Sequence, residues 1–336
     1  SRFGLARPLH GVSPEPTSTK AKTTTGAATV NPPSMLERDR YVATNRFTVR
    51  SGQEAKFEQR WANRKSRLAT LPGFRYFHLM RRMTLGKDEG DGDSLVYDGG
   101  QEDEGMFGNY VSFTIWEKKS HFDDWRKGDA FREAHGGTSI GAFVSAMVNS
   151  AFLLKTPPKP AMYDGILVQT TPAASMPSDD GKVMVNGWRK VDADGVHILP
   201  GECFVACNQF FVQPDRAAAF EERWASRESR LQECDGFVAF SMLRRDTGGG
   251  GGHNAKPMDP SKEPNYVSTT IWRDRQAFEG WKKSQAFKSA HGSGKPPATD
   301  TKDGPPTQQG PPPLWSKPPQ PVFYEGTLVI SSEEGV

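Results

Sequence analysis

The chain has 336 residues, of which 35% are hydrophobic and 25% charged, and its formal net charge is only +3. These proportions are typical of a globular protein of two or three domains, and the interspersed charges indicate neither a nucleic-acid nor a membrane partner. No apolar run approaches the roughly 20 residues that a membrane-spanning helix needs. The three cysteines all lie in the second half without a CxxC pair, so we expect an intracellular protein with reduced thiols.

The first segment, residues 1–40, is rich in Ser, Thr, Ala, Arg, Lys and Pro, and Glu15 is the only acid before Glu37. A segment of this composition cannot bury a core, so we expect a disordered leader. Basic, hydroxylated and acid-poor segments are also typical of organellar transit peptides. A low-complexity tail is the alternative interpretation.

From Tyr41 onward the sequence contains one unit twice. A strand-like run around Asn45 corresponds to one around Asn208, an offset of 163 residues. The helix-like stretches 55–68 and 219–231 then carry Phe, Trp and Leu at i, i+4 and i+11, which predicts one apolar stripe on each helix. In the later elements of the units the offset falls to 156, so the second unit has a net gap of seven residues in the variable loop that precedes those elements.

Each unit continues in the same way: a strand opened by Gly-Phe and ended by Arg-Arg, an irregular loop, a strand ended by Thr-Ile-Trp, a helix and a closing strand. The loop of the second unit holds five glycines, 248–252, which lack the GxxxxGK[ST] pattern of a phosphate-binding loop. Before the closing strand the first unit has an apolar, helix-like segment (140–154), whereas the second has a Pro- and Gly-rich one (292–321).

The element order strand–helix–strand–strand–helix–strand predicts an α+β fold of two tandem ferredoxin-like domains. We place domain 1 at 41–172, a linker at 173–200 and domain 2 at 201–333. One such sheet leaves a face and an edge open. We therefore expect the two domains to pack sheet to sheet as a pseudo-dimer within a monomeric chain.

Three polar or aromatic positions recur in both units where packing does not obviously require them: Asn45 and Asn208, Trp125 and Trp281, His135 and His291. Asn is unfavourable within a strand unless its amide is used. A neutral imidazole is a good iron ligand, and an amide can donate to a bound oxygen species. The histidines can equally be structural, since each ends a helix-like stretch and precedes a Gly. A zinc site is not expected, because no His/Cys/Asp set has ligand spacing.

The motifs Asn-Arg-Phe, Gly-Phe, Thr-Ile-Trp and Phe-x-x-Trp followed by Phe-x-x-Ala-His resemble the antibiotic-biosynthesis-monooxygenase superfamily. More narrowly, they are similar to the IsdG-type haem-degrading monooxygenases, and the likeness covers both units. Two such domains behind a leader of transit-peptide composition resemble the green-algal members. That resemblance implies a chloroplast location, with the cytoplasm as the alternative.

The resemblance implies a haem oxygenase in which haem b is both substrate and cofactor. O2 and electrons from an external donor, a reductase or a small reductant, would open the porphyrin and release iron and a linear tetrapyrrole. The implied roles fall to pairs of residues: His135 and His291 as proximal ligands of the haem iron, Asn45 and Asn208 as distal hydrogen-bond donors to dioxygen, Trp125 and Trp281 as the side chains that ruffle the porphyrin.

One straight helix would place Trp and His about 15 Å apart along its axis over ten residues. We therefore expect either a break near Gly128 and Ser284 or a Trp that touches only the porphyrin edge. The second unit departs from the family's Asn-Arg pair, since Gln209 follows its Asn. If only one site binds haem, we favour the second, where the Pro-rich segment can act as a lid. The alternative functions are a haem carrier or sensor without turnover, and a cofactor-independent monooxygenase acting on an aromatic substrate.

Overall fold

The structure is a computed structural model of the chain. The residues it describes are 36–86, 94–97, 108–135, 152–171, 182–247, 259–291 and 314–336. They belong to one compact unit, Pro32–Val336. Most of the expected leader, and most of the two segments that differ between the repeats, lie outside the described residues.

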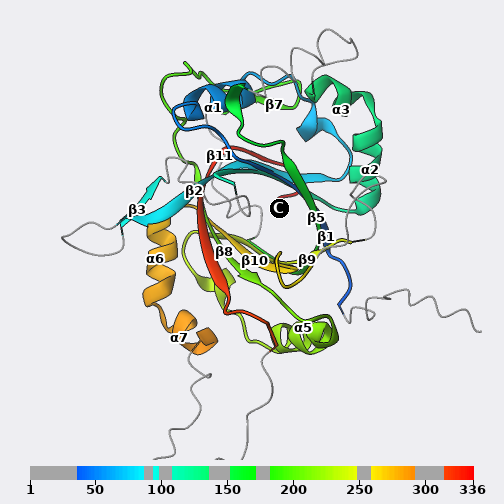
Figure 1. The fold of residues 1–336 in the computed structure, drawn as a ribbon, viewed down its shortest axis with the longest axis vertical. Helices are drawn as coiled ribbons and strands as arrows, with labels where there is room; N and C mark the ends of the chain where they lie inside the picture. The colour runs from blue at the N-terminus through cyan, green and yellow to red at the C-terminus, as the bar shows by residue number, and fades with distance from the viewer. Residues whose placement is uncertain are drawn as a thin grey trace, which may run out of the picture. The chain divides into compact units, whose positions relative to one another are not determined.

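The described part of each half follows the predicted order of elements, except that a short strand, Ser94–Tyr97, forms within the expected irregular loop of the first half (Figure 1). The first half consists of β1 (Arg40–Phe47), α1 (Glu54–Ala62), η1 (Leu68–Thr70), β2 (Phe74–Gly86), β3 (Ser94–Tyr97), β4 (Tyr110–Trp116), α2 (Lys119–Lys127), α3 (Asp129–Ala134) and β5 (Lys159–Thr170). The second half consists of β8 (Cys203–Phe210), η3 (Pro214–Arg216), α5 (Ala217–Ala225), η4 (Leu231–Glu233), β9 (Phe237–Arg245), β10 (Tyr266–Trp272), α6 (Arg275–Lys283), α7 (Gln285–His291) and β11 (Gln320–Ser331).

The two sheets join edge to edge into a closed ring. Their order is β11-β8-β10-β9-β5-β1-β4-β2, with β3 as an extra strand on β2, and β11 pairs back onto β2. Among the described residues, eight antiparallel strands therefore form one closed sheet. The junctions are β5–β9 and β2–β11, and each contains a register shift at a leucine of positive φ, Leu167 or Leu328. Such bulges bend a strand, which closure requires. The predicted α+β pseudo-dimer is confirmed.

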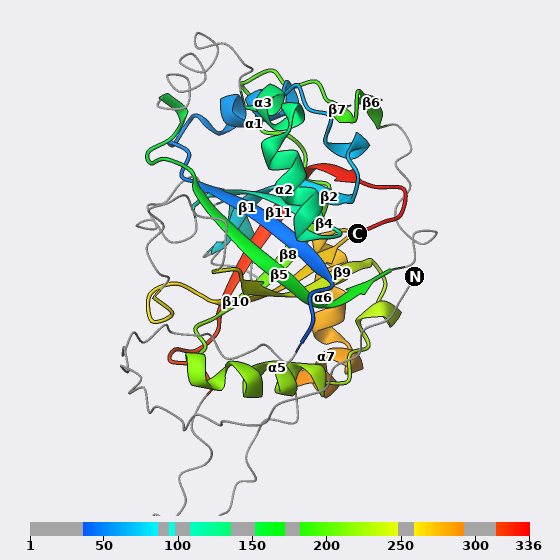
Figure 2. The ribbon, with the colours of Figure 1, turned by 90° about the vertical axis from the view of Figure 1, so that its right-hand side faces the viewer.

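Strand alternation divides the core into three apolar clusters. Residues such as Val42 and Val205 fill the interior of the ring, where the two sheets face each other. Their neighbours in sequence, such as Ala43 and Phe204, point outward into two further clusters. The helices α1–α3 cover the outer face of the first half and α5–α7 that of the second (Figures 1 and 2).

The first helix of each repeat is shorter than we expected. Its apolar stripe suggested 55–68, but α1 ends at Ala62, and Leu68 reaches the core from η1 instead. The repeat shows the same break between α5 and η4. The intervening run carries several cations, and one of them, Arg64, bonds to α3 rather than continuing the helix.

Residues 182–200, within the expected linker, form the hairpin β6 (Val183–Val185) and β7 (Trp188–Lys190). Trp188 is buried against Phe77, with ring centroids 5.2 Å apart, and Leu199 is buried in the same cluster. This segment is therefore part of the core of the first half.

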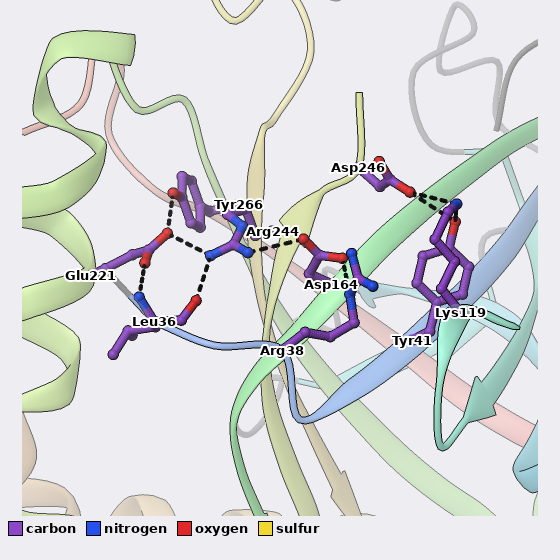
Figure 3. A network of polar contacts seen from close by, with 9 residues as sticks. All are labelled: Leu36, Arg38, Tyr41, Lys119, Asp164, Glu221, Arg244, Asp246 and Tyr266. Atoms are coloured by element: carbon purple, nitrogen blue, oxygen red, sulfur yellow. Dashed lines mark hydrogen bonds and ion pairs between the residues drawn. The ribbon is translucent and has the colours of Figure 1, made fainter. Parts of the chain in front are cut away.

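Two equivalent charged networks span the junctions between the halves. At one, Arg244 donates to Glu221 (3.1 Å) and to Asp164 of the other half (2.9 Å), and Leu36 N also donates to Glu221 (Figure 3). Nearby, Tyr41 and Lys119 of the first half both bond to Asp246 of the second. Leu36 lies in the segment that we assigned to the leader, yet it contacts the second half.

At the other junction, Arg81 donates to Glu58 (2.7 Å) and to Glu325 of the other half (2.5 Å). Glu58 also accepts from Tyr110 Oη and from Leu199 N. The partners match those of the Arg244 network position for position. The repeat has thus preserved both sides of an interface that two separate subunits would share.

Candidate functional site

The predicted asparagines lie on the helix-covered face of the sheet. Asn45 shares its face of β1 with Ala43 and Phe47, which belong to the cluster under α1 and α2. Asn45 is half-buried, and among the described residues its amide makes no hydrogen bond. Asn208 occupies the same position in β8 and is exposed. Among the described residues, neither amide has a hydrogen-bond partner.

A serine stands opposite each asparagine. Asn45 is paired with Ser112 of β4, and Asn208 with Ser268 of β10. Directly opposed residues of an antiparallel pair project from the same face, so each Asn has a hydroxyl beside it. We did not select these serines from the sequence, although the repeated Asn-Tyr-Val-Ser motif contained them.

The helix that carries Trp125 is interrupted before His135. This is the break near Gly128 that we gave as one alternative to a Trp touching only the porphyrin edge. The first part, α2, ends at Lys127, and Gly128 is extended with ψ 172° before α3 begins. The break brings the Trp125 and His135 rings to 6.3 Å between centroids. Phe131 packs edge-on against Trp125 at 5.0 Å and stacks on His135 at 3.9 Å.

The second half breaks in the same way at Ser284, which has ψ 163°. Ser284 accepts from Phe287 N at 3.2 Å, which caps the start of α7. Trp281 packs edge-on against Phe287 at 4.9 Å, as Trp125 does against Phe131. His291 is the last residue of α7, and its side chain lies outside the described residues.

His135 is held in one tautomer by its hydrogen bonds. Its Nδ1 lies 2.8 Å from Phe131 O, a carbonyl that can only accept, so Nδ1 carries the proton. Its Nε2 lies 3.2 Å from Arg64 Nη2, a group that can only donate, so Nε2 keeps its lone pair. This is the neutral tautomer that metal-binding histidines adopt.

The electrostatic surroundings also keep His135 neutral. The residue as a whole is exposed, but Phe131 and Arg64 lie against the ring. Desolvation, followed by the charge of Arg64, lowers the pKa of His135 to about 4. The imidazole therefore stays neutral throughout the physiological pH range, while its Nε2 lone pair accepts from Arg64.

Arg64 was not among the residues we selected. It lies over the Trp61 ring at 4.5 Å and donates from Nε to Ala134 O at 2.9 Å, so it ties the end of α1 to the end of α3. Arg227 lies over Trp224 at 4.2 Å in the same way. The signal in the sequence was the repeated Arg-Trp-Ala-x-Arg motif, which we used only for its tryptophan.

The site thus brings Trp125 and His135 together on α2 and α3, with Asn45 on the sheet face that these helices cover. Asn45 makes no hydrogen bond to either of them among the described residues. Within the same residues there is no group of three or more His, Cys, Asp or Glu that could hold a metal ion. Among the described helices, none combines the length and the apolar character that a membrane span requires.

These features define an α+β protein in which two ferredoxin-like halves close one antiparallel ring, with helices on the outer face of each half. The family model for antibiotic biosynthesis monooxygenase matches residues 40–137 and 203–293. The chain belongs to this family and carries its domain twice.

Among proteins of known function, the chain is similar to a heme oxygenase (staphylobilin-producing) of Staphylococcus haemolyticus. The identity is 29% over 115 residues, which is 34% of this chain and 91% of that protein. Among solved structures, the "Putative monooxygenase" of Fusobacterium nucleatum aligns with a TM-score of 0.46 and 10% identity, over 90% of this chain and 98% of the other. A protein of the same name from Lactobacillus acidophilus aligns with a TM-score of 0.45 and 9% identity, over 89% and 98%.

Proposed function

We propose that the protein is a haem-degrading monooxygenase. The observation that carries the proposal is His135 at the end of α3, whose fixed tautomer leaves Nε2 unprotonated. The donor set fits haem, because one neutral imidazole beside a wall of aromatic rings is what an axial iron site needs. The similarity to the staphylobilin-producing heme oxygenase supports the same choice.

When bound, haem supplies both the iron that activates O2 and the porphyrin that is oxidised, with electrons from an external donor. The chain itself contributes three things. His135 would ligate the iron through Nε2, and Asn45 would supply an amide donor from the sheet. Trp125 would press on the ligand, because its ring lies 6.3 Å from that of His135. In the second half, Asn208, Trp281 and His291 occupy the matching positions of the chain.

The test is a haem titration by absorption, followed by addition of a reductant under O2. An enzyme loses the Soret band and releases iron, whereas a carrier keeps the band. His135→Ala and His291→Ala should each remove one site from the binding stoichiometry, and Asn45→Ala should preserve binding but slow the loss of the band. His197→Ala is a matched control, since His197 is exposed and its ring bonds to the neighbouring Asp194 rather than to a residue of either site. No change in band position with haem would refute the proposal and favour a cofactor-independent monooxygenase.

A further inference from the structure

The Nε2 atom of His135 is already in use in this structure. It accepts from Arg64 Nη2 at 3.2 Å, and the same guanidinium holds Ala134 O through Nε. A nitrogen lone pair can be shared with only one strong partner in line with the ring. An iron atom and Arg64 therefore cannot both occupy Nε2.

Among the described residues, the hydrogen bonds of Arg64 give its positive charge no carboxylate partner. Its described hydrogen-bond partners are a backbone carbonyl and a neutral imidazole, and it rests on the face of Trp61. The next cation along the chain that faces α3, Arg67, differs because it pairs with Glu133 at 2.9 Å. Burial and the nearby Arg60 lower the pKa of Arg64 to about 10, so it remains charged near neutral pH.

We propose that Arg64 is a carboxylate-responsive gate on His135: a carboxylate on the incoming ligand draws the guanidinium away and thereby frees Nε2 to bind the metal. The inference rests on the proposed function, and it adds the selection rule that the first site admits metal tetrapyrroles only when they carry carboxylates. Arg64 is then a specificity-determining residue that contacts the ligand.

The exchange is favourable for a plain electrostatic reason. A guanidinium–carboxylate pair adds the attraction between opposite charges and can be bidentate, whereas the imidazole is a single neutral acceptor. Arg64 would exchange a bond to an uncharged ring for a bond to an opposite charge. A ligand without carboxylates offers no such partner, so it must compete with Arg64 for Nε2.

The contact can be tested without any porphyrin. Diethyl pyrocarbonate modifies imidazole nitrogens that have a free lone pair, and mass spectrometry resolves the rate at His135 from that at the exposed His197. Arg64→Ala should raise the rate at His135 by on the order of threefold to tenfold, the change in population that one net hydrogen bond produces. Arg67→Ala should leave it unchanged. An equal rate in wild type and Arg64→Ala would overturn the gate.

The selection rule is tested with two probes, iron protoporphyrin IX and its dimethyl ester, titrated into the full chain carrying His291→Ala. With Arg64 present, the free acid should bind about tenfold or more tighter than the ester. With Arg64→Ala that ratio should fall toward one, because the acid loses a partner and the ester loses a competitor. A ratio that Arg64→Ala does not change would refute the selection rule. If neither probe shows a histidine-ligated spectrum, the proposed function fails, and the pyrocarbonate rates still decide whether Arg64 covers His135.

Discussion

The charged junction between the halves makes a sharp prediction about stability. Glu58 is completely buried and accepts from Arg81, Tyr110 Oη and Leu199 N, and the Arg81 side chain is only 2% exposed. Burial alone would lower the pKa of Arg81, but Glu58 and Glu325 outweigh it and raise that pKa. The guanidinium therefore stays charged, and it depends on Glu58 as its buried counter-ion.

The change Glu58→Gln keeps the shape of the side chain and removes its charge. Breaking a buried ion pair costs about 3–5 kcal/mol, and the remaining bond of Arg81 to Glu325 places the expected loss near the lower end, about 3 kcal/mol. The repeat provides a comparison, Glu221→Gln. Its partner Arg244 is 19% exposed and also bonds to Asp164, so water screens the loss and about 2 kcal/mol is expected.

The measurement is urea unfolding, in which the midpoint should fall while the m-value stays constant. Glu133→Gln is the control, because the Arg67–Glu133 pair is exposed on both sides and such pairs contribute about 0–1 kcal/mol. Combining Glu58→Gln with Arg81→Met should recover part of the loss, since no charge is then left buried without its partner. A loss below about 1 kcal/mol for Glu58→Gln, or a loss equal to that of Glu133→Gln, would refute the reasoning.

Three further outcomes are expected. Burial lowers the pKa of His78, inside the ring, to about 3, so the unfolded chain binds more protons than the folded chain below about pH 6.5. Between about pH 6.5 and about pH 4.5 the free energy of unfolding should therefore fall by about 2.5 kcal/mol more in the wild type than in His78→Gln, as measured by urea unfolding at these two pH values. Burial raises the pKa of Cys203 and Cys207 to about 12. A thiol reagent should therefore label Cys234 in the native protein and the two buried cysteines only on unfolding. Equal labelling rates for all three cysteines would contradict the closed ring. Gly73 has a φ of 70°, and a Cβ there would lie 1.8 Å from Nδ1 of His121. Gly73→Ala should therefore lower the free energy of unfolding by roughly 2 kcal/mol, whereas Gly52→Ala, with open space around it, should show only the backbone part of that loss.

Much of the fold could be predicted from local sequence. The alternation in β1 and β8, the Phe–Trp stripe of α1 and α5 and the doubled element order are periodic signals, and each is set by neighbours within a few residues. The helix break at Gly128 was one of two alternatives that the rise of an α-helix allowed, and the sequence did not decide between it and a Trp that touches only the porphyrin edge.

The ends of α1 and α5 could not be predicted in this way. The stripe that ends at Leu68 fits a continuous helix, but Leu68 reaches the same core through a short 3₁₀ turn. Periodicity shows only which residues are apolar on one side. A continuous helix and a helix followed by a 3₁₀ turn both place those residues in the core, so periodicity does not distinguish them. In the structure Arg64, which lies between the two elements, bonds to Ala134 at the end of α3, a contact that periodicity does not reveal.

The sequence by itself determined that there are two halves, which face of each strand is apolar, and which side chains recur where packing does not require them. Only the tertiary structure decided that β5 meets β9 and β11 meets β2, and that Arg64 lies on His135 rather than in solvent. The physical reason is that repeats and periods arise from bonded neighbours, whereas strand-edge pairing and side-chain hydrogen bonds depend on which distant groups compete for the same buried donors and acceptors.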